Sequence, residues 1–262
     1  MRLRFDIAYD GTDFHGWAAQ PQLRTVQGEL EHWLSRILRM QAQLTVAGRT
    51  DAGVHASGQV AHLDVDDSVN PEDLHRRLNR VLPEDLVITA LTQVPDAFDA
   101  RFSAIWRRYR FLLCDGPWDP MNRSKTVKVQ HLDVEAMGQA GEKLLGLNDF
   151  TAFCKAREGA TAIRTLQSLT VARVNGLIEI EVQADAFCHS MVRSLVGALV
   201  RVGKGERPID WPQSLLDAPE RSSQIPVMPA KGLTLIAVGY PPDEQLAERA
   251  EQARNRRTKD CC

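Results

Sequence analysis

Apolar residues recur in this chain with two different periods, and the order of these periods constrains the fold more than any other feature. Residues 2–9 alternate apolar and polar side chains, which is typical of a half-buried strand. Residues 26–40 carry apolar side chains every three or four positions, which indicates an amphipathic helix, and Thr25 precedes it as a suitable N-cap. Further along, the same two patterns predict strands at 44–47, 59–65 and 85–94 and a second helix from Pro71.

The second half of the chain repeats this order of elements. Its patterns predict strands at 104–114, 166–174, 177–184 and 233–240, and helices at 134–145 and 191–202. Asn175-Gly176 lies between two of these strands, and Asn-Gly between two apolar runs is a strong hairpin signal.

Strand, helix, strand, strand, helix, strand is the order of the ferredoxin-like, or split βαβ, arrangement. We therefore expect an α+β fold of two such halves, with mainly antiparallel sheets, meeting around a central cleft suited to a catalytic site. The expected domains are residues 1–104 and 105–240. Pro241-Pro242 then breaks the last strand, and we expect residues 241–262 to form a polar tail that is a loose helix or disordered.

Composition limits the classes of function. The 262 residues include 32 Lys and Arg against 34 Asp and Glu, so the net charge of −2 requires any nucleic-acid site to be a local patch. Neither a membrane-spanning run nor the apolar stretch of a signal peptide is evident, and we expect a cytoplasmic protein without a membrane partner. The five cysteines are irregularly spaced, and we interpret them as reduced thiols.

The segment Gly48-Arg49-Thr50-Asp51-Ala52-Gly53-Val54-His55 has the composition of a functional loop. It joins two strand-like runs, and its glycines permit positive φ and close backbone approach, so its polar side chains could be held beside a ligand. From composition alone, a tight turn with a surface ion pair between Arg49 and Asp51 remains an alternative.

Extended to Ala47-Gly48-Arg49-Thr50-Asp51-Ala52-Gly53-Val54-His55-Ala56, this segment resembles the signature of the TruA family of tRNA pseudouridine synthases. The resemblance spans residues 3 to about 240. It continues in Tyr9-Asp10-Gly11-Thr12, Gly16-Trp17, Thr25-Val26-Gln27, Arg101-Phe102-Ser103-Ala104, Arg107 to Tyr109, Asp149-Phe150-Thr151, Ile163-Arg164, Met191-Val192-Arg193 and Val196-Gly197. Ala18 and Asp99 depart from the usual family residues, Gln and His, which bears on RNA contacts rather than on the chemistry.

The resemblance implies the pseudouridine synthase fold and the conversion of uridine to pseudouridine at positions 38, 39 and 40 of the tRNA anticodon stem-loop. Asp51 matches the family's nucleophile, and a carboxylate suits covalent catalysis. Attack on uracil C6 and attack on ribose C1′ both remain open. An ionised, partly desolvated carboxylate needs a nearby cation, and Arg193 is the candidate. Tyr109 matches the tyrosine that stacks on the flipped-out uracil.

Other residues are expected to contact the RNA. The guanidinium of Arg49 suits a phosphate, whereas His55 is expected to stabilise the loop. Between Arg101 and Lys128 there are seven cations against two acids, a local charge of +5. The expected RNA-binding patch comprises Arg76, Arg77, Arg101, Arg107, Arg108 and Arg110. The family resemblance also implies a homodimer that binds the anticodon arm of tRNA. We expect no metal and no small-molecule cofactor.

Three other functions are suggested by parts of the sequence. An RNA-binding module shares the split βαβ order, but it would carry an aromatic signature on a central strand that this sequence lacks. An aspartyl-phosphate hydrolase is suggested by Asp10-Gly11-Thr12, although Ala8 stands where that chemistry usually has a second aspartate. A phosphate-binding enzyme is weakly suggested by Gly203-Lys204-Gly205, without a complete Walker or dinucleotide pattern.

Overall fold

The structure of the chain is a computed structural model that describes residues 1–156 and 161–254. It divides into two compact α+β units. Among the described residues, the first unit contains Met1–Ile105 and residues 234–254, and the second contains Trp106–Leu233. Among the described residues, every helix is too short or too polar to span a membrane.

The sheet of the first unit is built around its first strand. β1 pairs antiparallel with β3 on one side and with β4 on the other, and β2 adds to β3. The alternation of β1 is strict, and its inward side chains are buried at Leu3, Phe5, Ile7 and Tyr9. The strands of this sheet are β1 (Arg2–Tyr9), β2 (Thr45–Val46), β3 (His55–Asp64) and β4 (Leu86–Val94).

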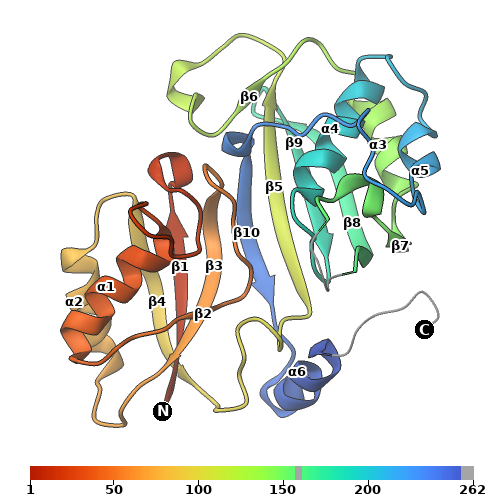
Figure 1. Ribbon diagram of the computed structural model, residues 1–262. Helices are drawn as coiled ribbons and strands as arrows, with labels where there is room; N and C mark the ends of the chain where they lie inside the picture. The colour runs from red at the N-terminus through yellow and green to blue at the C-terminus, as the bar shows by residue number, and fades with distance from the viewer. Residues whose placement is uncertain (157–160, 255–262) are drawn as a thin grey trace. The chain divides into compact units, whose positions relative to one another are not determined.

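Two helices lie side by side against this sheet (Figure 1). They are α1 (Val26–Leu38) and α2 (Pro71–Val81). Each begins where a polar side chain accepts a hydrogen bond from the first turn, Thr25 from the Gly28 N–H and Asn70 from the Asp73 N–H. Their apolar stripes supply buried leucines to the core.

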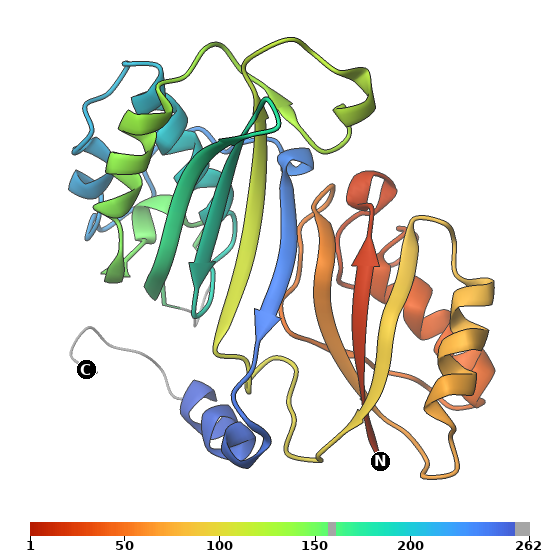
Figure 2. The same ribbon diagram turned by 180° about the vertical axis from the view of Figure 1, so that it is seen from behind.

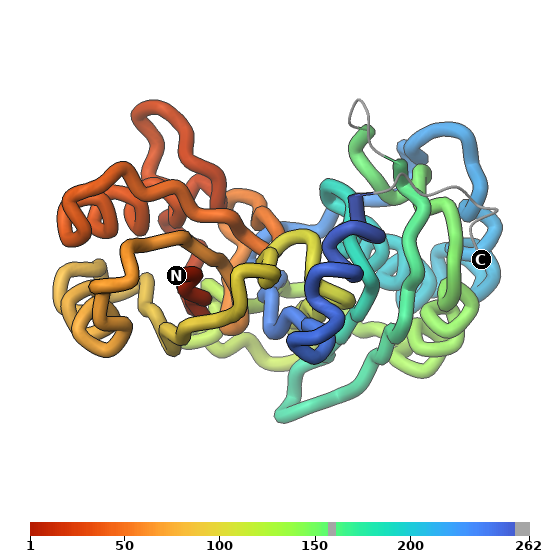
Figure 3. Tube along the Cα trace, turned by 90° about the horizontal axis from the view of Figure 1, so that it is seen from below, coloured from red at the N-terminus to blue at the C-terminus, as the bar shows by residue number. Residues whose placement is uncertain are grey.

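The chain returns to the first unit at its C-terminal end. β10 (Leu233–Gly239) pairs parallel with β3, with Thr234 opposite His55. After the 3₁₀ turn Asp243–Gln245, α6 (Leu246–Arg254) packs beside the segment that follows β4 (Figure 3). Leu246 is buried in a cluster with Ala47, Val60, Phe98 and Ala100.

This arrangement corrects one expectation and decides between two others. The strand expected at 233–240 joins the first unit from Thr234 on, rather than the second. Of the loose helix and the disorder expected from residue 241, the structure has a helix through Arg254, because burial of Leu246 and Ala250 fixes α6. The Cys261-Cys262 tail lies outside the described residues.

The sheet of the second unit is a run of antiparallel strands in the order β5-β9-β8-β7, with β6 parallel to β5 (Figure 2). Asn175 and Gly176, between β8 and β9, both have positive φ, 49° and 79°, as the predicted hairpin turn requires. The strands are β5 (Trp106–Cys114), β6 (Val127–Lys128), β7 (Gly146–Asp149), β8 (Ile163–Val174) and β9 (Leu177–Ala184).

Helices cover one face of this sheet, as Figure 2 shows from behind. α3 (Val134–Glu142) packs on β8 and on α4 (Met191–Gly203), and the short α5 (Trp211–Ser214) contacts both helices. α4 is buried along most of its length. The predicted α+β class with mainly antiparallel sheets is confirmed. β7, which the sequence patterns did not predict, takes the edge of this sheet beside β8.

Candidate active site

The segment that carries Asp51 is a short loop between β2 and β3, residues 48–54, called here the Asp51 loop. Its side chains alternate in exposure. Arg49 is exposed, Thr50 is buried and Asp51 is half-buried. Thr50 therefore anchors the loop to the interior, while its neighbours on either side remain accessible to a ligand.

The segment Gly11–Trp17 crosses the Asp51 loop and holds it by backbone contacts. The Trp17 N–H donates to the Thr50 carbonyl over 3.0 Å, and the Gly53 N–H donates to the Phe14 carbonyl over 3.2 Å. Gly16 has a φ of +88°, and a Cβ there would stand 2.8 Å from the Thr50 oxygen. The close approach of the two backbones requires glycine at this position.

A buried hydrogen-bond chain supports the loop from below. The hydroxyls of Tyr9 and Thr50 are 2.7 Å apart. The Gln59 amide donates to the Gly48 carbonyl over 2.8 Å and lies 3.4 Å from the Tyr9 hydroxyl. Burial raises the pKa of Tyr9 to about 12, so its hydroxyl stays neutral at physiological pH.

His55 fixes the start of the crossing segment, in agreement with its expected structural role. Its ring is buried, and its Nδ1 lies 3.0 Å from the Gly11 N–H and 3.1 Å from the Asp10 carboxylate. One ring nitrogen cannot accept the first contact and donate to the second. We assign Nδ1 as the acceptor, because the backbone N–H of the buried Gly11 needs a partner.

Tyr109 lies in the second unit, on β5. Its ring is buried and meets Phe187 edge-on, with centroids 5.1 Å apart. Tyr109 and Phe111 share the inward face of β5, as predicted from the alternation. An edge-on neighbour fixes the ring plane, which suits a ring that receives another flat group on its face.

Arg107 shares that inward face, and this corrects the expected RNA-binding patch. Its guanidinium is buried and donates to the Asp185 carbonyl over 2.8 Å, so it does not belong to an exposed patch. Arg108 and Arg110 point to the other face. There they bond to Gln183 and to the carboxylates of Glu179 and Glu181.

The remaining patch residues lie in the first unit. Arg76 and Arg77 are exposed on α2 and both contact the carboxylate of Asp73. Arg101 is exposed, and its guanidinium lies over the ring of Phe102. The acidic partners reduce the local positive charge below the count obtained from the sequence.

Arg193 lies in the first turn of α4 and is partly buried. Its Nε donates to the Met228 carbonyl over 2.6 Å, and the Met228 N–H donates back to the Arg193 carbonyl. Four residues further along, Gly197 touches the same segment, since a Cβ there would meet the Pro226 oxygen at 1.8 Å. Arg193 therefore binds the neighbouring segment that contains Met228.

The family model for tRNA pseudouridine synthases matches residues 7–103 and 140–241. The tRNA pseudouridine synthase A of Cutibacterium acnes is 56% identical, over 100% of this chain and 97% of its own length. Those of Frankia casuarinae and Leifsonia xyli are 52% and 51% identical, over 97% and 98% of this chain and 94% and 98% of their own lengths. The chain belongs to the tRNA pseudouridine synthase family. It is therefore an isomerase that acts on uridine in tRNA.

Similarity to solved structures is weak. A chain of a Cbf5-Nop10-Gar1 complex matches with a TM-score of 0.36 and 14% identity, over 76% of this chain and 45% of that chain.

The features that suggested other functions have structural roles in this pseudouridine synthase. The carboxylate of Asp10 caps the 3₁₀ turn Gly11–Asp13 by accepting from the Thr12 N–H. Lys204 lies at the C-terminal end of α4, whereas phosphate loops place their backbone N–H groups at a helix N-terminus. Within residues 1–156 and 161–254, the structure holds no cluster of three potential metal ligands.

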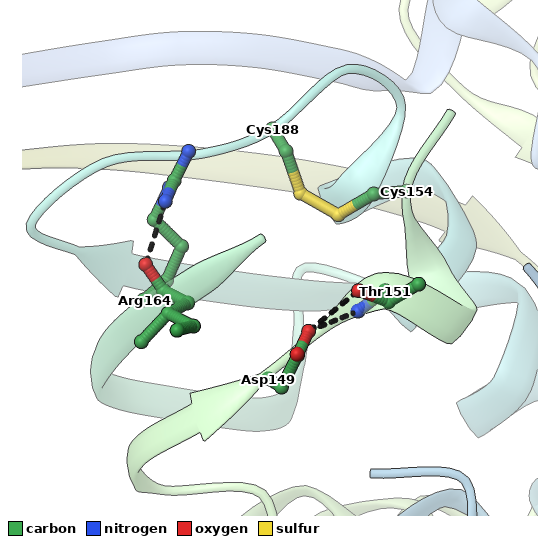
Figure 4. The surroundings of a disulfide bond; sticks show 6 residues. Asp149, Thr151, Cys154, Arg164 and Cys188 are labelled. Carbon is green, nitrogen blue, oxygen red and sulfur yellow. Dashed lines mark hydrogen bonds between the residues drawn. A yellow bond between two sulfur atoms is a disulfide. The ribbon is translucent and has the colours of Figure 1, made fainter. Parts of the chain in front are cut away.

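The cysteines of this synthase differ from the expectation of reduced thiols. Cys154 and Cys188 are joined by a disulfide, with Cα atoms 5.8 Å apart, a separation that disulfides commonly span (Figure 4). Cys154 ends the 3₁₀ turn Thr151–Phe153, and the adjacent Lys155 N–H donates to the His189 carbonyl. Two loops that are far apart in sequence are thereby brought together. Cys114 is buried as a free thiol.

Sequence reasoning missed Tyr9 and Gln59, which support the candidate nucleophile. In the sequence, Tyr9 is recognisable only as an apolar residue of the strand at 2–9 and as the first residue of the motif Tyr9-Asp10-Gly11-Thr12. Gln59 is fully buried within β3, and a glutamine inside an apolar run is a usable signal, because a buried amide must be hydrogen-bonded.

Proposed function

We propose that the chain isomerises uridines 38, 39 and 40 of the tRNA anticodon stem-loop, with Asp51 as the nucleophile. The observation that carries the proposal is the environment of Asp51. It is half-buried on a loop whose neighbouring residue, Thr50, is held by two hydrogen bonds. A carboxylate on a fixed loop can attack a carbon atom and later leave, dividing the transfer of the glycosidic bond from N1 to C5 of uracil into easier steps.

Tyr109 is proposed to stack on the flipped-out uracil, and Arg193 to stabilise the ionised carboxylate of Asp51. The edge-on contact of Tyr109 with Phe187 supports the first role, because it fixes the plane of the receiving ring. Partial burial of Arg193 supports the second, because a charge is less screened in such surroundings. Arg49, which is exposed beside Asp51, is proposed to bind a phosphate of the substrate.

The proposed RNA-binding patch is now Arg76, Arg77, Arg101, Arg108 and Arg110, without the buried Arg107. We also propose that the active form is a homodimer and that it acts in the cytoplasm. The homodimer follows from the family resemblance, and sedimentation of the purified protein would test it. The cytoplasmic location is the expectation drawn from the sequence.

Tritium release from tRNA labelled at uracil C5 tests the nucleophile, since forming the new bond at C5 expels that hydrogen. Asp51→Asn keeps the size of the side chain but removes the nucleophilic charge. We expect it to bind tRNA with unchanged affinity and to release no tritium above background. Asp13→Asn, at an exposed acid of the crossing segment, serves as the matched control and should release tritium at the wild-type rate.

Measurable turnover by Asp51→Asn would overturn the nucleophile assignment. Pseudouridine mapping in tRNA treated with the wild-type enzyme tests the target positions. Modification outside positions 38 to 40, with none inside, would reject the proposed substrate site while leaving the chemistry intact.

A further inference from the structure

We propose that Tyr9 is a positioning residue for the isomerisation, and that its buried hydroxyl fixes the Asp51 loop through Thr50. The proposal rests on the role proposed for Asp51 and extends it to a residue that belongs neither to the loop nor to the expected site.

The hydrogen-bond chain beneath the Asp51 loop has a definite direction. The Gln59 side-chain nitrogen can only donate, so the Tyr9 oxygen accepts from it over 3.4 Å. The buried Tyr9 proton needs an acceptor of its own, and we assign it to the Thr50 hydroxyl, 2.7 Å away. Donation thus runs from Gln59 through Tyr9 to Thr50. All three side chains are buried, so water does not compete for these bonds.

Tyr9 lies where the pairing of β1 with β3 is irregular. Ile7 lies opposite Gln59 in the pairing of β1 with β3, yet Tyr9 lies opposite Ala56, so β3 contains one extra residue between these two pairs. Such a β-bulge changes the direction of nearby side chains. Gly58 lies within it and approaches β10 closely, since a Cβ there would stand 2.2 Å from the Ile236 oxygen. The end of β1 that follows this irregularity carries Tyr9, whose hydroxyl reaches Thr50 of the Asp51 loop.

Thr50 is held by two hydrogen bonds, one to its carbonyl and one to its hydroxyl. The Trp17 N–H fixes its carbonyl from the crossing segment, while Tyr9 fixes its side chain from the interior. Asp51 is the next residue, so the two restraints together limit the torsions that set the position of its carboxylate. Displacement of a catalytic group by about 1 Å can lower a rate by about 100-fold.

The test compares two tyrosine-to-phenylalanine variants of the full-length chain. Tyr9→Phe removes the hydroxyl beneath the Asp51 loop. Tyr240→Phe removes a hydroxyl of the same unit that donates to the Ala100 carbonyl over 2.7 Å rather than to the Asp51 loop. We expect Tyr9→Phe to lower kcat on tRNA by about 10- to 100-fold with KM within about twofold. Tyr240→Phe should keep the wild-type kcat, with a similar change in Tm.

Two further measurements separate positioning from other roles. Thr50→Ser, which keeps the hydroxyl, should retain more activity than the isosteric Thr50→Val. The pH–rate profile of Tyr9→Phe should keep the wild-type shape at a lower plateau, whereas loss of an ionising limb would identify Tyr9 as a proton donor or acceptor instead.

The outcomes distinguish this inference from the proposed function. A wild-type kcat for Tyr9→Phe overturns the positioning role, even if Asp51→Asn is inactive. An equal fall in kcat for both phenylalanine variants also overturns it, because the effect would then be general destabilisation. An active Asp51→Asn rejects the nucleophile itself, whatever the behaviour of Tyr9→Phe.

Discussion

At the scale of single residues, the candidate site depends on backbones that approach more closely than side chains allow. Gly16 combines a φ of +88° with a Cβ position 2.8 Å from the Thr50 oxygen and 3.2 Å from the Asp51 carbonyl carbon. Alanine at this position would be strained in its own backbone and would push the Asp51 loop away. We predict that Gly16→Ala lowers the free energy of unfolding in urea by about 1 to 3 kcal/mol and reduces turnover more than tRNA binding.

Gly48 provides the matched control, since it begins the Asp51 loop and a Cβ there would meet no atom within 4 Å. The free energy of unfolding of Gly48→Ala should therefore lie within about 0.5 kcal/mol of the wild-type value. If the two alanine variants were equally stable, the close approach at Gly16 would not be the reason for glycine there.

Side-chain direction on β5 illustrates what the sequence could predict at this scale. Alternation correctly placed Tyr109 and Phe111 on one face, and the same rule assigns Arg107 to that face as well. Charge alone suggested an exposed patch, yet the buried Asp185 carbonyl provides an acceptor that the sequence does not reveal. The partners of Tyr9 were beyond prediction, because Thr50 lies on the Asp51 loop and Gln59 lies beside a bulge in β3, and periodicity does not bring either to Tyr9.

At the scale of elements, local periodicity predicted most helices and strands, and β1 and β9 have the predicted bounds. It did not predict which unit β10 joins. That choice depends on a parallel pairing with a strand about 180 residues earlier, Thr234 opposite His55, and an apolar run alone does not specify its partner. The short β7 has too few residues to show any period.

The link between Cys154 and Cys188 yields a prediction at this scale. It joins the turn after β7 to the loop that leads into α4, across 34 residues of sequence. Closing a loop of this size restricts the unfolded chain, so reduction should lower the free energy of unfolding by about 2 to 4 kcal/mol. Peptide mapping without reductant should recover the two cysteines in one linked fragment, and urea unfolding with and without reductant should show the loss.

Cys114→Ser is the control for this measurement, because Cys114 is buried without a disulfide. This variant should keep the full difference between oxidised and reduced protein, whereas Cys188→Ser should abolish it. Separate peptides for Cys154 and Cys188 in the protein as purified would instead support the reduced thiols expected from the sequence.

At the scale of the whole molecule, residues 234–254 belong to the unit in which the chain begins. Leu246 packs with Ala47 and Val60, about 200 residues earlier, and its carbonyl accepts from the Ser103 hydroxyl. The sequence indicates a polar tail, because apolar residues are few in this stretch. In the structure, two residues of α6 are buried. A weak amphipathic pattern does not show that a helix docks, since docking depends on a surface made elsewhere in the chain.

The stability of the folded chain should decrease in two stages as the pH is lowered. His62 is affected first. Burial, and then the neighbouring Arg2, lower the pKa of His62 below its ordinary value of 6.5. The unfolded chain therefore binds this proton more readily than the folded chain, and stability decreases as pH falls below about 6.5.

Carboxylates account for the second stage. Hydrogen bonding to Arg173 lowers the pKa of Asp115 from 3.8 to about 2. Hydrogen bonds to arginines also lower the pKa values of Asp64 and Glu206. Because these pKa values are depressed in the folded state, their contribution is present above about pH 4 and is lost between about pH 4 and pH 2. For Asp115 this contribution is about 1 to 2 kcal/mol, since the exposure of Arg173 screens the pair.

Urea unfolding measured from pH 7 to pH 2 would resolve both stages, and two variants assign them. Asp115→Asn cannot ionise, so its stability should be lower at pH 7 and should lose less than the wild type between pH 4 and pH 2. His62→Gln should flatten the curve between pH 6.5 and pH 5 while leaving the lower stage unchanged. A wild-type stability that stayed constant from pH 7 to pH 5 would show that His62 accepts a proton equally well in the folded chain. The buried contact between its Nδ1 and the Ala100 N–H, 3.0 Å long, argues against that, because a protonated Nδ1 could no longer accept this bond.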